Sequence, residues 1–215
     1  GTEGACGADE EGGERMKRRK TATFYLAVVI VLIFIVNVAV GGGNRFWIFL
    51  TGGGHVKDYG EASFKLVLEQ GQWWRLLTCG YLHMGVFHLV GNMAALEMIG
   101  TRVERKLGAV WMLIIYNLGT MLIAFLWCLV FPEGWTVGAS LGIFVLLGML
   151  CVMLFSKGGK GLTELSRYER GYLVFYVIAG CFLGIGTIVG HLIGFVIGIL
   201  VGFAILKMHL QGRTG

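Results

Sequence analysis

Two side chains in strongly apolar stretches of this sequence could together carry out nucleophilic chemistry, Ser140 and His191. A serine hydroxyl becomes a nucleophile when an imidazole within hydrogen-bond reach accepts its proton. Two further polar residues, His88 and Asn92, lie four positions apart in another apolar stretch. On a helix, that spacing places both side chains on one face, where they can point at a common target. These types and spacings predict a serine nucleophile with a histidine base, if the fold brings the three stretches together.

The serine lies in the local pattern GxSxG, written here Gly138-Ala139-Ser140-Leu141-Gly142. In soluble hydrolases this pattern marks a strand-to-helix nucleophile turn. No strand is expected here, so the pattern indicates only a need for close backbone approach around the serine. A chance GxSxG, a histidine that bonds between helices and a glycine stripe are each more often structural. Only their combination favours catalysis.

Few other residues could take part in a serine mechanism. The remaining serines, Ser63, Ser156 and Ser166, fall in expected loops or at the end of an apolar stretch. The only aspartates are Asp9 and Asp58, in the amino-terminal segment and the first long loop. The sequence therefore predicts a Ser-His dyad instead of a triad with a buried aspartate.

Composition places the chain in a membrane. Of its 215 residues, 56% are hydrophobic and only 14% are charged, which is too apolar for a domain with a water-facing surface. A transmembrane helix needs about 20 mostly apolar residues. Six stretches approach this requirement: 24–40, 82–99, 110–131, 137–155, 172–183 and 188–208. We therefore expect an all-α, polytopic membrane protein with six transmembrane helices and a long first outer loop that is partly helical.

The distribution of charge distinguishes six spans from five. Most of the 18 lysines and arginines fall within 15–20, 102–106, 157–170 and 207–213, which six spans place on one side of the membrane. Merging the last two stretches into one span would move the basic carboxyl end to the other side. Six spans with both termini in the cytoplasm agree better with the positive-inside rule.

This topology gives the polar residues a common depth. The second, fourth and sixth spans all run inward from the outer face, and they carry His88 with Asn92, Ser140 and His191 near their starts. Polar groups inside a membrane are costly and by default functional. Four unrelated structural residues would have no reason to share one level, so their agreement supports a single outward-facing site.

A glycine stripe predicts close approach of a neighbouring helix to the sixth span. Gly190, Gly194, Gly198 and Gly202 recur every fourth residue in the sixth span. Such small-xxx-small stripes allow a neighbouring helix to approach closely. If that neighbour is the fourth span, His191 lies within hydrogen-bond reach of Ser140.

The chain divides into three parts. We expect residues 1–20 to form a disordered, basic-ended cytosolic tail, residues 21–210 a single membrane domain, and residues 211–215 a short cytosolic tail. The net charge of +5 is explained by topology and does not indicate nucleic-acid binding. Five cysteines form no CxxC pair, and no metal site or cofactor is expected.

Order and spacing of these motifs resemble the rhomboid family of intramembrane proteases over about residues 24–208. The match comprises Trp74-Arg75, His83 with His88 and Asn92, Gly100 with Glu104 and Gly108, the GxSxG at Ser140, and His191 with Gly194 and Gly198. The resemblance implies a six-helix bundle with a water-filled cavity that opens outward. It also implies cleavage of transmembrane segments of other proteins, so the expected partners are transmembrane substrates and the lipid bilayer.

The resemblance also implies roles for individual residues. Ser140 matches the family's nucleophile and His191 its general base, while His88 and Asn92 match the side chains of the oxyanion hole. Phe144 matches an aromatic ring that packs on the histidine. Structural support is implied for eight residues: Trp74, Arg75, Glu104, Gly138, Gly142, Phe144, Gly194 and Gly198. Leu141 and Val145 depart from the family, which usually has glycine at both positions.

Two other functions agree less well with the sequence. A catalytically silent rhomboid-like protein would bind membrane clients without cutting them, but the presence of all four polar residues argues against it. A transporter or channel would need paired ionisable residues along a pathway, and only Glu97 fits. The compact length is typical of a bacterial plasma-membrane enzyme.

Overall fold

The computed structural model describes residues 21–156, 161–182 and 184–211. The expected tails, 1–20 and 211–215, therefore lie outside the described residues, apart from residue 211. The described α-helices are α1 (Ala22–Val40), α2 (Arg45–Thr51), α3 (His55–Gly60), α4 (Arg75–Thr78), α5 (Gly85–Leu107), α6 (Ala109–Val130), α7 (Ser140–Phe155), α8 (Arg167–Cys181) and α9 (Ile185–Gln211). A π-helical turn, η1 (Lys65–Glu69), and two 3₁₀ turns, η2 (Cys79–Tyr81) and η3 (Gly161–Glu164), complete the helical elements. The only described strands, β1 (Ala62–Ser63) and β2 (Trp135–Thr136), pair antiparallel. Each has only two residues, so the fold is all-α.

Several helices are long and apolar enough to cross a membrane. Within the described residues, three meet that requirement on their own: α1, α6 and the 185–208 part of α9. A fourth is added if α4 with η2 and α5, which are bent by 93°, form one broken span. Helix α7 is apolar but has 16 residues, and α8 has 15. Each of the six expected stretches thus overlaps one helix, although length and composition alone support three or four spans.

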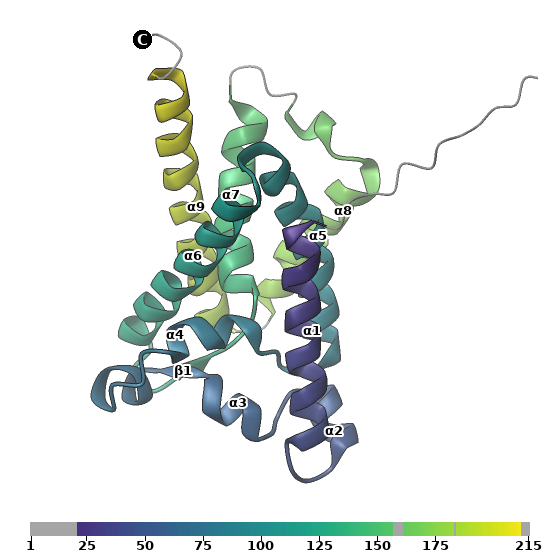
Figure 1. Cartoon of the computed structure of the whole chain (residues 1–215), viewed down its shortest axis with the longest axis vertical. Helices are drawn as coiled ribbons and strands as arrows, with labels where there is room; N and C mark the ends of the chain where they lie inside the picture. The colour runs from purple at the N-terminus through teal and green to yellow at the C-terminus, as the bar shows by residue number, and fades with distance from the viewer. Residues whose placement is uncertain (1–20, 157–160, 183, 212–215) are drawn as a thin grey trace, which may run out of the picture.

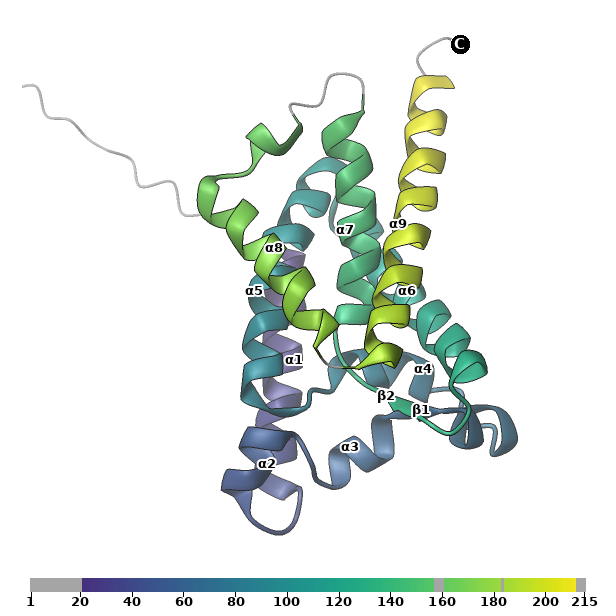
Figure 2. The ribbon, with the colours of Figure 1, turned by 180° about the vertical axis from the view of Figure 1, so that it is seen from behind.

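The short elements gather at one end of the bundle. Figures 1 and 2 show α2, α3, α4 and the two strands at the lower end, opposite the carboxyl end of α9. Helices α5, α7 and α9 begin at this lower end, whereas α1, α6 and α8 run toward it. The residues near the starts of α5, α7 and α9 are therefore brought to the same end of the molecule.

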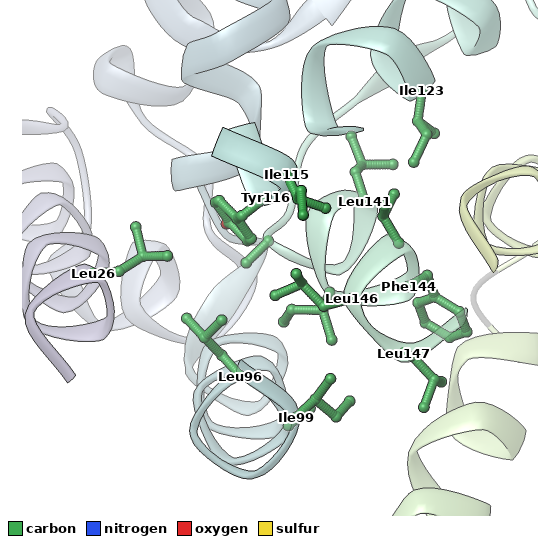
Figure 3. Close-up of a cluster of buried hydrophobic side chains, with 14 of the residues drawn as sticks. Leu26, Leu96, Ile99, Ile115, Tyr116, Ile123, Leu141, Phe144, Leu146 and Leu147 are labelled. Carbon is green, nitrogen blue, oxygen red and sulfur yellow. The ribbon is translucent and has the colours of Figure 1, made fainter. Parts of the chain in front are cut away.

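Helix α7 forms the centre of the bundle. It packs on α9, α6 and α5, and nearly all of its residues are buried. A helix that is apolar on every face is buried either by lipid or by protein, and for α7 the neighbouring helices provide the cover. Leu146 and Leu147 of α7 lie in the hydrophobic cluster with Leu96 of α5 and Ile123 of α6 (Figure 3). Ser140 at the start of α7 is thus held by helices on several sides.

Glycines allow α7 and α9 to pack backbone to backbone. A Cβ atom at Gly198 of α9 would lie 2.0 Å from the carbonyl oxygen of Val145. A Cβ atom at Gly148 of α7 would lie 2.1 Å from the carbonyl oxygen of Phe195. Each helix therefore places a glycine where the other helix's main chain passes, which explains the stripe seen in the sequence.

We expect Gly198→Ala to lower the free energy of unfolding by about 1–3 kcal/mol, the usual cost of overpacking. The clash is with main-chain atoms, so no side-chain rotation relieves it and α9 has to shift. Reversible unfolding in mixed detergent micelles measures the change. Gly171→Ala is the control, because no atom lies within 4 Å of a Cβ at that exposed helical position. A loss no greater than that of the control would contradict this packing.

Arg75 holds the segment between α1 and α5 together. Its guanidinium is buried and donates to the carbonyl oxygens of Asp58 and Glu61, each at 2.8 Å, and its Nε donates to Gln72 at 2.6 Å. One side chain thereby links α4 to the end of α3 and to the residue before β1. Trp74, at the start of α4, is 57% exposed and does not share this network.

Glu104, near the carboxyl end of α5, binds the amino end of α1. Its carboxylate accepts hydrogen bonds from the backbone N–H groups of Ala22 and Thr23, both at 2.8 Å, and from the Thr23 hydroxyl at 2.7 Å. The first N–H groups of a helix have no partner within it, so a carboxylate there satisfies them and interacts favourably with the helix dipole.

Glu104→Ala is expected to lower the free energy of unfolding by about 1–2 kcal/mol, the range found for lost helix caps. The same detergent unfolding experiment measures it. Glu97→Ala is the matched control, because Glu97 is an exposed carboxylate on the same helix. Equal destabilisation by the two variants would contradict a capping role.

Candidate active site

One cavity at the lower end of the bundle is lined by Ser140, His191 and His88. Its volume is about 190 Å³, and its walls also include Met84, Trp127, Thr136, Val137, Leu141, Gly186, Thr187 and Gly190. The three chemically active side chains come from α7, α9 and α5, the helices that begin at this end. Three apolar stretches of the sequence thus meet around one small space.

Ser140 is the first residue of α7 and is buried. Its backbone N–H belongs to the first turn, where no intrahelical acceptor exists, and lies at the positive end of the helix dipole. Gly138, two positions before the serine, is held by a distant segment, because its N–H donates to the carbonyl oxygen of Cys79 at 2.9 Å. The serine therefore presents both a hydroxyl and a free main-chain donor.

Gly138 permits the close approach of His88 to Ser140. Its φ of +131° disfavours residues with a side chain. A Cβ atom at this position would lie 3.2 Å from His88 Nε2 and 3.5 Å from Ser140 Oγ. The first glycine of GxSxG is thus required both by conformation and by the two functional groups beside it.

His191 is held by an aromatic ring and a glycine. The ring of Phe144, one turn after Ser140, stacks on the imidazole with centroids 4.0 Å apart and planes inclined by 9°. A Cβ atom at Gly180 of α8 would lie 2.9 Å from His191 Nδ1. These contacts fix the plane of the imidazole ring.

His191 Nε2 is buried and has no hydrogen-bond partner among the described residues. It therefore shares the cavity with Ser140 without an established bond to its hydroxyl. Nucleophile–base hydrogen bonds are often long or poorly aligned in a resting enzyme and shorten when substrate binds.

Two side-chain donors lie on α5: His88 lines the cavity, whereas Asn92, one turn further along the helix, is not among the lining residues. His88 Nδ1 accepts the backbone N–H of Met84 at 3.3 Å, which leaves the proton of the neutral ring on Nε2, the atom near Gly138 and Ser140. Asn92 is buried, and its Oδ1 accepts the hydroxyl of Tyr176 at 2.7 Å. Asn92 Nδ2 has no partner among the described residues. Both groups can therefore donate a hydrogen bond to a developing negative charge.

Gly142, the second glycine of GxSxG, and the two residues that differ from the family pattern, Leu141 and Val145, all pack against neighbouring groups. A Cβ atom at Gly142 would lie 2.5 Å from the Tyr116 ring. A Cβ atom at Gly119 would lie 2.8 Å from Val145 Cγ2, so the larger Val145 is accommodated by a glycine on α6. Leu141 lines the cavity as an apolar wall and is 4% exposed.

Gly194 lies where α9 meets α6 and α7. A Cβ atom at Gly194 would lie 2.9 Å from Ile123 Cδ1 and 3.4 Å from the carbonyl oxygen of Leu141. Of the residues expected to support the site, Gly138, Gly142, Phe144 and Gly194 pack on it or beside it, and Gly198 lies further along α9. Trp74, Arg75 and Glu104 do not line the cavity.

Three residues at the site have no counterpart in the sequence analysis: Tyr176, Trp127 and Gly180. Trp127 lines the cavity, and its Nε1 donates to the carbonyl oxygen of Gly186 at 2.9 Å, which ties α6 to the start of α9. Only one feature of the sequence could have pointed to Tyr176. It lies four residues after Tyr172, which places both phenol side chains on one helix face. Within the described residues, no group of three or more His, Cys, Asp or Glu side chains could hold a metal ion.

Comparison with known proteins gives consistent matches. The family model described as the rhomboid domain matches residues 70–208. RHOMBOID-like protein 7 of Arabidopsis thaliana is 35% identical over 134 residues, covering 62% of this chain and 41% of that protein. Rhomboid protease GluP of Bacillus subtilis is 32% identical over 133 residues, covering 62% of this chain and 24% of its own length.

Another relative is named as lacking activity. Inactive RHOMBOID-like protein 8 of Arabidopsis thaliana is 27% identical over 122 residues, covering 57% of this chain and 35% of that protein. The chain thus spans well under half the length of these curated relatives.

Proposed function

Because this chain belongs to the rhomboid family, we propose that it is an intramembrane serine protease that hydrolyses peptide bonds in or near transmembrane segments of other membrane proteins. The observation that carries the proposal is the single cavity lined by Ser140, His191 and His88. The relatives include both a protease and a protein named as inactive. The choice between an active and an inactive protein therefore depends on the side chains that this chain carries at the site. The presence of a serine, a histidine and two adjacent donors favours the enzyme.

The proposed reaction proceeds through an acyl-enzyme. Ser140 Oγ attacks the peptide carbonyl carbon while His191 Nε2 accepts its proton, and the imidazolium then protonates the departing amine. Water, activated by the same imidazole, hydrolyses the ester. The oxyanion formed in each step accepts hydrogen bonds from His88 Nε2, Asn92 Nδ2 and the Ser140 N–H.

We also propose six spans with the cavity opening to the outer side. Support comes from the distribution of basic residues, which place both termini on the cytoplasmic side. In this arrangement α7 and α8, each shorter than a typical span, count as crossings. Most of the relatives are plant proteins, and they give no support to a bacterial plasma membrane, so we assign the chain to a membrane without naming which one.

The decisive experiment uses the purified chain in lipid vesicles with a model single-span substrate and, separately, a fluorophosphonate probe. We expect cleavage of the substrate and probe attachment at Ser140, identified by mass spectrometry. Ser156→Ala is the control, because Ser156 follows the opposite end of α7 and its hydroxyl bonds to Met153. Binding of the substrate without cleavage or labelling would favour the catalytically silent alternative.

A further inference from the structure

Tyr176 of α8 contacts the candidate site in two places, the Phe144 ring that stacks on His191 and the amide of Asn92. Its ring stacks on Phe144, with centroids 5.6 Å apart and planes inclined by 24°, and Phe144 in turn stacks on His191. Its hydroxyl donates to Asn92 Oδ1 at 2.7 Å. The side chain is 9% exposed and is therefore fixed by packing as well as by the hydrogen bond.

The hydrogen bond to Asn92 has a directional consequence. An asparagine amide ends in one acceptor, Oδ1, and one donor group, Nδ2, which exchange places when the amide turns by half a revolution. Only Nδ2 can stabilise an oxyanion, whereas Oδ1 in the same place would repel it. A tyrosine hydroxyl can donate one hydrogen bond and accept another. In the observed orientation it donates to Oδ1 and leaves Nδ2 unbonded. In the turned amide Nδ2 would donate to the hydroxyl oxygen, and the buried hydroxyl proton would lose its acceptor.

We propose that Tyr176 is a positioning residue, which selects the orientation of the Asn92 amide in which Nδ2 is free to donate to the oxyanion. The inference rests on the proposed function and adds a side chain from α8 to the polar functional groups supplied by α5, α7 and α9. Tyr176 itself does not line the cavity that holds Ser140 and His191. Its effect is transmitted through one hydrogen bond.

The structure supplies a matched control four residues earlier. The hydroxyl of Tyr172, on the same face of α8, donates to the carbonyl oxygen of Gly91 at 2.6 Å. Both tyrosines therefore dock α8 on α5 through one hydrogen bond to neighbouring residues. A backbone carbonyl has no alternative orientation, so the Tyr172 bond contributes docking without orienting a catalytic group.

The test compares Tyr176→Phe with Tyr172→Phe in the vesicle assay, since both variants keep the ring and remove one hydroxyl. We expect Tyr176→Phe to lower kcat about five- to tenfold, the order of one lost hydrogen bond, while KM stays within about twofold. Tyr172→Phe should leave kcat within about twofold of the wild type. Thermal unfolding in detergent should show similar small losses for both, because each variant loses one docking bond.

A double variant separates orientation from stability. When Asn92 is already alanine, there is no amide to orient, so adding Tyr176→Phe should change kcat by less than about twofold. Equal activity of wild type and Tyr176→Phe, or a fully multiplicative loss in the double variant, would overturn the positioning role. These outcomes presuppose a wild type that cleaves, whereas absence of wild-type cleavage and labelling would instead refute the proposed function.

Discussion

Ser140→Ala is expected to lower the rate of substrate cleavage by at least about 10⁴-fold, and His191→Ala by a comparable factor. Without the hydroxyl there is no acyl-enzyme. Without the imidazole, the buried hydroxyl has no group in the cavity positioned to accept its proton. Residual hydrolysis would come only from substrate binding and oxyanion stabilisation. Cleavage in vesicles, followed over long incubations, measures both variants.

The double variant tests whether the two residues act as a unit. Members of a nucleophile–base pair are strongly non-additive, so Ser140→Ala/His191→Ala should be about as slow as either single variant. Leu200→Ala is a control on α9, since Leu200 is 63% exposed and lies away from the cavity. Losses that multiply, or a His191→Ala enzyme within about tenfold of the wild type, would refute the dyad.

Asn92→Ala and His88→Ala are each expected to lower kcat about 10²- to 10³-fold with little change in KM. The lost hydrogen bonds form mainly with the oxyanion and not with the ground-state carbonyl, so binding is affected much less than the chemical step. Steady-state kinetics with the model substrate separate the two parameters.

A second asparagine, which is half-buried, controls for the loss of a hydrogen-bonded amide. Asn117 of α6 accepts the Tyr81 hydroxyl at 2.7 Å and donates to the carbonyl oxygen of Leu113 at 2.8 Å, so both ends of its amide are engaged, whereas Asn92 Nδ2 has no partner among the described residues. Asn117→Ala should therefore lower stability and leave kcat nearly unchanged. If Asn92→Ala instead raised KM at constant kcat, Asn92 would serve ground-state binding and the oxyanion assignment would be wrong.

Much of the fold follows from local sequence patterns. Apolar length and basic flanks identified the stretches that become α1 and α5 to α9, because hydropathy is a property of each segment by itself. The glycine stripe predicted that a neighbouring helix packs closely on α9, and the contact of Gly198 with Val145 shows that this neighbour is α7. The family membership expected from the motifs is confirmed by the match over residues 70–208.

Other features depended on contacts between distant segments. Length and composition did not establish α7 as a span, because a central helix is stabilised by its neighbours and needs no full-length lipid-facing surface. Val145 and Leu141 looked anomalous in the sequence, yet Gly119 accommodates the first and the cavity wall includes the second. Val145 and the Gly119 that makes room for it lie on different helices, so no local sequence pattern links the two residues.

The sequence by itself determined which residues could perform chemistry, Ser140, His191, His88 and Asn92, and which end of the spans they occupy. Only the tertiary structure decided how those side chains are oriented. The Tyr176 hydroxyl reaches Asn92 across 84 positions of the chain, and Phe144 sets the plane of His191 across a helix interface. Periodicity fixes the face and depth of a residue along its own helix, whereas orientation is set by partners that the folded chain brings from elsewhere.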